Sequence, residues 1–204
     1  MKATESHIVV ALVEDLGHYP YEVWDLGLDH LDMFTEEVLE ELHAIAWAEG
    51  NRYPSHYTMG GRTGQHNWGA SGSFSEIIMQ VASNAGGGVG AVATTAAIKS
   101  VYEKLRSRAH GDAWRTMPSE ERAVELAKSR LHQHYAVAVD KLTVIRSDMD
   151  VQAQRYDIEL SHEDGRKFGA TVGAIRGMPS CTRVWAEGAD LMPRPAPTPP
   201  DPGV

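Results

Sequence analysis

The segment from Ile77 to Ile98 contains no charged residue, and it constrains the fold more than any other part of the chain. A helix of about 20 apolar residues is long enough to cross a membrane. Here, however, strongly apolar side chains are few, and polar residues and glycines lie between them. Burying those polar groups in lipid costs more than the apolar groups gain, so we expect no membrane partner. A buried helical core is the preferred interpretation, with a subunit interface or a membrane-active segment as alternatives.

Signals for helix ends flank and interrupt this segment. Ser73 and Glu76 have the spacing of a capping box, which predicts that a helix begins at about Phe74. Three successive glycines at 86–88 make a continuous helix costly, so a break and a second helix from Val89 to Arg106 are expected. Small residues recur along this segment, and such a strip allows another backbone to approach closely. The residues predicted to serve packing or an interface are Ala82, Gly86, Gly90, Thr94 and Ala97.

The chain before this segment is predicted to contain a strand and a helix. The apolar run from His7 to Val13 is typical of a strand buried on both faces. Residues 35–50 have one apolar face at helical spacing, with acidic residues in the first turn. Residues 51–72 are glycine-rich and predict an irregular connector. Backbone amides ahead of a helix are suited to anions, so this connector contributes a candidate anion-binding loop made of Gly69, Ser71, Gly72 and Ser73.

The second part of the chain predicts a helix followed by an antiparallel meander. A helix beginning at Ser119 carries one apolar stripe, and strands are expected at 142–146, 155–161, 167–175 and 182–187. Asp164-Gly165 is a strong hairpin signal between two of these strands. The last fourteen residues contain six prolines and predict a flexible tail. We therefore expect an α+β fold with an acidic domain at 1–109, a helix-plus-meander domain at 110–190 and a tail at 191–204.

Charge is distributed unevenly over the chain. Residues 1–50 contain twelve acidic residues and a single basic one, Lys2, whereas the rest of the chain contains 18 basic and 16 acidic residues. The acidic part would repel nucleic acid, so no nucleic-acid partner is expected. The chain has one cysteine, Cys181, which excludes an intramolecular disulfide and fits a reducing compartment. The first residues do not resemble a signal peptide, and a cytoplasmic location is expected.

Catalytic and metal sites are not predicted, although the chain has ten histidines. Glu40 and His43 have the spacing of a di-iron ligand pair, but a second such pair is missing. His132 and His134 would point to different faces of a helix. His66 near Ser71 lacks a pattern that supplies an orienting acid or an oxyanion hole. We predict no catalytic residue, no metal ligand and no cofactor.

Several features together resemble the effector-associated constant component family. They are the Gly-Ala-Ser-Gly lead-in at 69–72, a helix beginning at 75–78, the glycine-rich stretch at 86–90, an alanine-rich helix with basic residues through Arg108, and later strand pairs with an Asp-Gly turn. This resemblance implies a non-enzymatic component of actinobacterial conflict systems, which accompanies proteases or other effectors. In addition, the helix and strands up to the Val172–Gly177 stretch resemble the helix-plus-three-strand unit of PepSY-type domains.

The sequence leaves three classes of function open. The preferred hypothesis is a binding or assembly protein, such as an adaptor of a bacterial conflict system, that associates with a protein partner or with itself. The second is a structural subunit of a phage or injection-system particle. The third is a hydrolase that uses His66 and Ser71, or a membrane-active effector.

Overall fold

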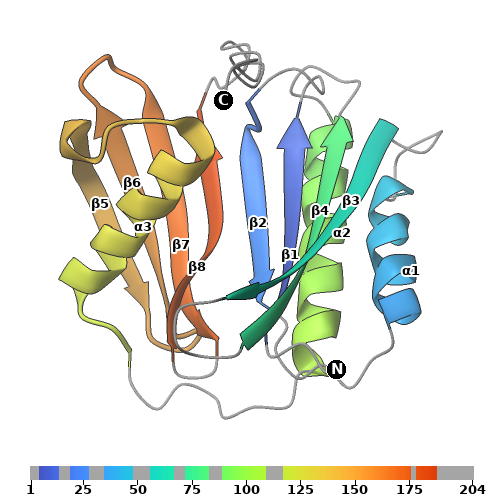
Figure 1. Cartoon of the computed structure of the whole chain (residues 1–204). Helices are drawn as coiled ribbons and strands as arrows, with labels where there is room; N and C mark the ends of the chain where they lie inside the picture. Colours follow the sequence, from blue (N-terminus) through green and yellow to red (C-terminus); the bar gives the residue numbers. More distant parts are fainter. Residues whose placement is uncertain are drawn as a thin grey trace, which may run out of the picture.

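The computed structural model of the chain describes residues 5–13, 19–27, 35–47, 56–66, 72–82, 89–108, 117–175 and 178–187. The predicted α+β class is confirmed (Figure 1). The helices are α1 (Thr35–Ala46), α2 (Val89–Ser107) and α3 (Glu120–Tyr135), with a short 3-10 helix at Val139–Lys141. The strands are β1 (Glu5–Val13), β2 (Glu22–Gly27), β3 (His56–His66), β4 (Gly72–Ala82), β5 (Leu142–Asp150), β6 (Arg155–His162), β7 (Lys167–Ile175) and β8 (Met178–Ala186).

The eight strands form one sheet in the order β3-β4-β1-β2-β8-β7-β6-β5. Strands β1 and β4 are parallel, and the other neighbouring pairs of this sheet are antiparallel. The two parts of the chain meet where β2 pairs with β8, and this pairing aligns Trp24 with Arg183. The predicted domains on either side of residue 109 therefore share a single sheet. The predicted tail at 191–204 lies outside the described residues.

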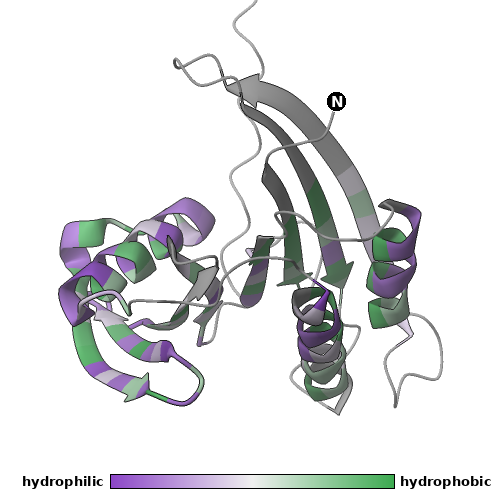
Figure 2. Ribbon diagram, turned by 90° about the horizontal axis from the view of Figure 1, so that it is seen from below, coloured by the Kyte–Doolittle hydropathy of each residue, from purple (hydrophilic) through white to green (hydrophobic). Residues whose placement is uncertain are grey.

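The helices cover opposite faces of the sheet in its two halves. Figure 2 shows α3 on one side of the sheet and α1 and α2 on the other. Strand β1 contributes to both layers, because Val10 and Leu12 pack with α1 and α2 whereas Ala11 belongs to the core beneath α3. The prediction that this strand is buried on both faces is confirmed. One half of each sheet face is thus covered by helix.

Strand β2 connects the two layers through a pair of buried carboxylates. Glu22 and Asp25 are each 5 % exposed. Glu22 accepts a hydrogen bond from the Thr95 hydroxyl of α2 at 3.2 Å. Asp25 forms an ion pair with Arg130 of α3, on the opposite face. Buried charges are tolerated when they are paired, so these contacts fix β2 against both helical layers.

The predicted helix and strands of the second part are confirmed. The Ser119 hydroxyl caps α3 by accepting a hydrogen bond from the Arg122 backbone N–H at 3.3 Å. The helix ends where Ala136 adopts a left-handed conformation, with φ of 53°. Strands β6 and β7 are connected through the predicted turn, in which Gly165 has φ of 91°. This positive φ is the reason that the turn needs a glycine.

The helix predicted from Phe74 is wrong, and so is the irregular connector over residues 56–66. Residues 72–82 form β4, and residues 56–66 form β3. In β4 the buried residues Met79 and Val81 alternate with the more exposed Ile78 and Gln80, which is the period of a strand. The capping-box spacing was overridden because β4 pairs with β1 on one side and with β3 on the other. The part of the family resemblance that rests on a helix at 75–78 therefore lies on a strand.

The small-residue strip is divided between two elements. Ala82 is the last residue of β4, whereas Gly90, Thr94 and Ala97 belong to α2. Gly86 lies outside the described residues. A single helical strip starting at Ala82 is therefore not formed, although α2 matches the predicted second helix closely. Thr94 is buried, and a role of these residues in packing or in an interface stays a prediction.

Candidate functional site

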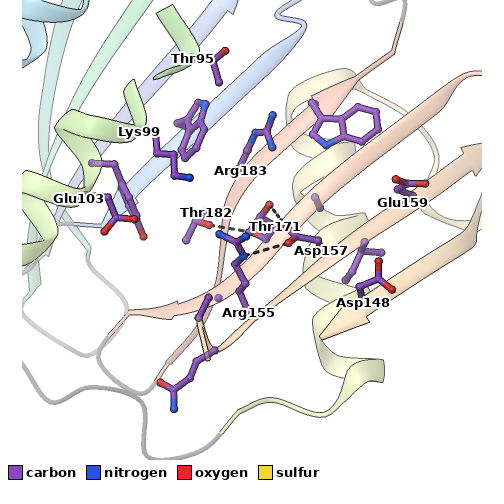
Figure 3. Close-up of a pocket in the computed structure, with 18 of the residues that line it drawn as sticks. Thr95, Lys99, Glu103, Asp148, Arg155, Asp157, Glu159, Thr171, Thr182 and Arg183 are labelled. Atoms are coloured by element: carbon purple, nitrogen blue, oxygen red, sulfur yellow. Dashed lines mark hydrogen bonds and ion pairs between the residues drawn. The ribbon is translucent and has the colours of Figure 1, made fainter. Parts of the chain in front are cut away.

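Strands β5 to β8 have one face beneath α3 and a second face that no described helix covers. This second face and the neighbouring side of α2 enclose a hollow of about 780 Å³ (Figure 3). We call the strand residues on this side the open face. They are Arg146, Asp148, Arg155, Asp157, Glu159, Thr171, Thr182, Arg183 and Trp185, and α2 adds Thr95, Lys99, Tyr102 and Glu103 to the wall.

A bulge in β5 places Arg146 on the open face. Val144 pairs with Leu160 of β6, and the next pair is Arg146 with Glu159, so Ile145 is an additional residue on β5. Leu160 is part of the core beneath α3, whereas Glu159 lies on the open face. Without the extra residue, strict alternation would turn Arg146 toward the α3 side. The bulge therefore determines on which face the rest of β5 presents its charges.

A second bulge in β8 has the same consequence for Arg183. Thr171 of β7 pairs with Arg183, but the following Val172 pairs with Cys181, which leaves Thr182 as the additional residue. Cys181 is buried beneath α3, whereas Thr182 and Arg183 both line the hollow. Bulges often re-aim side chains next to functional sites. In this protein each of the two strand irregularities delivers an arginine to the same face.

Arg183 is held in a fixed position by Glu22 and Trp24. Its Nε lies 2.5 Å from Glu22 Oε1, and its guanidinium carbon lies 5.3 Å from the centre of the Trp24 ring. The Trp24 indole N–H donates to the same carboxylate at 2.7 Å. About a third of the Arg183 side chain is still exposed. Its charge is thus positioned in advance but remains in reach of a bound molecule.

A second network lies in the middle of the open face. The Thr171 hydroxyl donates to Asp157 Oδ1 at 2.7 Å, and Arg155 Nε lies 3.2 Å from Asp157 Oδ2. The Thr182 hydroxyl donates to the backbone carbonyl of Thr171 at 3.3 Å. In Figure 3 these side chains converge beneath Lys99, which extends from α2. The network orders Arg155 and Asp157 while both remain more than two-fifths exposed.

Trp185 provides the large aromatic surface of the open face. Its indole occupies the space above Gly169 of β7, where any Cβ atom would overlap the ring. The half-buried ring contributes to the hollow beside α2 and also to a second hollow of about 510 Å³, which Ile145 lines as well. An aromatic side chain that is supported from below and accessible from above is a typical anchor for a bound protein.

The open face carries charges of both signs. The basic side chains along the larger hollow are Lys99, Arg146, Arg155 and Arg183, and the acidic ones are Glu103, Asp148, Asp157 and Glu159. Among the described residues, no histidine, cysteine or serine lines this hollow. Within the described ranges, no group of three histidine, cysteine or acidic side chains is arranged to hold a metal ion.

The predicted anion-binding loop does not precede a helix. Gly72 and Ser73 belong to β4, and Gly69 and Ser71 lie outside the described residues. The amides of a helix N-terminus, on which that hypothesis depended, are therefore not provided by this segment. His66 ends β3, and its suggested partner Ser71 is not described. A role for either residue stays untested.

Two further histidines and the basic end of α2 have structural contacts. The His43 ring lies 5.5 Å from the Tyr57 ring, and His132 Nδ1 lies 2.8 Å from the carbonyl oxygen of Val137. Lys104 of α2 forms an ion pair with Glu41 of α1, and Arg108 lies 3.3 Å from Glu37. The basic end of α2 thus joins the acidic helix α1. Part of the strong acidity of the first fifty residues is balanced by this helix pairing.

Cys181 is a core residue and not a reactive thiol. Its side chain is 3 % exposed, and burial raises the pKa of the thiol to about 12. The nucleophilic thiolate is therefore scarce at neutral pH.

Sequence reasoning did not identify the open face as a site. Arg155, Asp157 and Glu159 alternate along β6, which showed that this strand has a polar side. The position of Arg146 and Arg183 depends on the bulges, and bulges are visible only once neighbouring strands are paired.

Comparison with protein-family models, with curated proteins and with solved structures found no match for this chain. Among the described helices, none combines the length and the apolar character that crossing a membrane requires.

Proposed function

We propose that the protein is a non-enzymatic binding protein that holds a protein partner on the open face. The observation that carries this proposal is the pair of bulges that turns Arg146 and Arg183 toward a sheet face beside Trp185 that no described helix covers. Arginine and tryptophan are the residues most enriched among the energetically dominant contacts of protein interfaces. Their ordered networks reduce the conformational entropy that would be lost on binding.

The charge pattern favours a protein segment over a polyanion. Asp148, Asp157 and Glu159 stand between the arginines, so a phosphate backbone would meet repulsion along the same surface. A peptide that carries both acidic and basic side chains, with an apolar group over Trp185, would satisfy all of these positions. We further propose that this binding serves the role of an adaptor in a bacterial conflict system. This part of the proposal is supported by the resemblance of the sequence to the effector-associated constant component family.

A displayed library of random peptides, selected against the purified protein, tests the proposal. Peptides that use the open face should lose at least about tenfold in affinity toward the Trp185→Ala and Arg155→Gln variants, because each change removes an anchoring contact. Trp47→Ala and Arg122→Gln are matched controls. Trp47 is 65 % exposed at the end of α1, and Arg122 pairs with Glu125 on the surface of α3.

Titration of the selected peptides against all four variants, with circular dichroism to verify folding, gives the result. Peptides that bind the open-face variants as well as the parent would show that the binding surface lies elsewhere. Cleavage of a bound peptide would overturn the non-enzymatic part of the proposal.

A further inference from the structure

Strand β5 forms one end of the sheet, and among the described strands only β6 lies next to it. It is nine residues long. Ile145 and Met149 on this strand, and Val151 just after it, are 55 %, 52 % and 68 % exposed. An edge strand of this length presents free backbone N–H and C=O groups, and exposed apolar side chains make it a template for pairing with another chain.

We propose that β5 pairs with β5 of a second copy of this chain, in an antiparallel arrangement with the two-fold axis at Ser147. In this register Arg146 of each copy stands opposite Asp148 of the other, so that two opposite-charge pairs form. A register centred on Arg146 places the two Arg146 side chains opposite each other. A register centred on Asp148 pairs Arg146 with Asp150 but places the two Asp148 side chains opposite each other. The order of charges along the strand therefore favours the register centred on Ser147 over the two neighbouring registers.

The environment of Asp148 within one chain supports this occupant. Across the β5–β6 pairing, Asp148 stands opposite Asp157, a like charge. Asp157 already interacts with Arg155 and Thr171, whereas Asp148 is paired with Arg146 of its own strand at 2.5 Å. Arg146 and Asp148 are both more than half exposed. A second arginine from another copy would offset the repulsion that β5 and β6 create.

Ile145 and Met149 lie at the two ends of this pairing, where contact with the second copy removes part of their apolar surface from water. A contact along a single strand is smaller than the standard interface of stable complexes. We therefore expect a reversible dimer with a dissociation constant on the order of micromolar.

A two-fold axis perpendicular to the sheet leaves both open faces on the same side of the combined sheet. If the proposed function is correct, the dimer presents two partner sites side by side, and a partner with two recognition segments gains from binding both. This consequence depends on the proposed function, whereas the dimer itself does not.

Charge reversal tests the register. Arg146→Asp and Asp148→Arg should each weaken self-association at least about tenfold, because each change creates two like-charge pairs across the axis. The two variants mixed together should form a heterodimer, since one chain then offers only acidic and the other only basic side chains at these positions. Sedimentation velocity over a range of concentrations, and native mass spectrometry of the mixture, measure both effects. Arg122→Asp, a reversal on the surface of α3, is the control and should associate like the parent.

A neutral variant covers the case in which a reversed strand fails to fold. The R146Q/D148N chain should remain folded by circular dichroism, associate more weakly than the parent, and lose the salt dependence that the charge pairs confer on the parent. A parent chain that stays monomeric at all concentrations overturns the proposal. Variants that dimerise like the parent, or a mixture that yields no heterodimer, overturn the proposed register.

Discussion

The two halves of the sheet differ in how far apart their paired strands lie along the chain. Strands β5, β6 and β7 each pair with the next strand in sequence, and α3, which covers this part of the sheet, precedes them. In the other half β1 pairs with β4, which aligns Ile8 with Ile77, and β2 pairs with β8. Local contacts cost less chain entropy to form than distant ones. We infer that the half beneath α3 is the more autonomous unit and that the other half depends on it.

Cavities in the two helical layers should produce the largest losses of stability, and they test whether one half of the sheet depends on the other. Leu42 of α1 and Leu131 of α3 are both fully buried. Replacement of either by alanine should lower the free energy of unfolding by about 2–5 kcal/mol. Leu42→Ala should reduce hydrogen-exchange protection in β1 and β4 and leave β6 and β7 protected.

The effect of Leu131→Ala should extend over both halves. Detachment of α3 would leave the buried Asp25 without Arg130, and an unpaired buried charge is strongly destabilising. Native-state hydrogen exchange of the two variants distinguishes these patterns. Equal losses of protection in all strands for both variants would show that the halves unfold as one unit.

Replacement of one glycine in each half by alanine should change the stability by a smaller amount. Gly169→Ala forces the Trp185 indole away from β7, and such overpacking costs about 1–3 kcal/mol. Gly60→Ala in β3 has no heavy atom within 4 Å of the new Cβ and should leave the stability unchanged or raise it by up to about 1 kcal/mol. Thermal melts of both variants provide the test, and a stable Gly169→Ala chain would show that Trp185 has a second position of similar energy.

Alkaline pH should act mainly on the half beneath α3. Burial raises the pKa of Cys181 to about 12 and raises the pKa of Tyr135 above its ordinary value of 10.0. The unfolded chain would release these protons first, so the stability is complete below pH 9.0 and declines as pH rises from there toward the folded-state pKa values. The loss from Cys181 should reach about 1 kcal/mol roughly half a unit above pH 9.0.

Denaturant titrations at several pH values measure this decline. Between neutral and alkaline pH, the slope of the free energy of unfolding against pH should be smaller for Cys181→Ala than for the parent. A slope that does not change on this substitution would mean that the thiol is accessible in the folded protein.

The same contrast between near and distant contacts explains what could be predicted from the sequence. The start of the helix at Ser119, the turn at Asp164-Gly165 and the strand at 155–161 follow from local signals, and each was confirmed. Strand β4 was mistaken for a helix because its identity depends on β1, about seventy residues away. The open face was missed for a related reason, since its arginines are placed by bulges that exist only relative to a partner strand.

The pairing of β2 with β8 also determines when the sheet can be completed during translation. Residues 22–24 emerge from the ribosome long before residues 183–185, which become their neighbours. At the rate at which polypeptides are synthesised, about 5–20 residues per second, the edge of β2 waits on the order of ten seconds or more for β8. During that time the backbone groups of β2 and the side chain of Val23 lack the cover that they have in the finished protein. A nascent chain of this protein is therefore expected to bind a chaperone at β2 and to release it when β8 has been made.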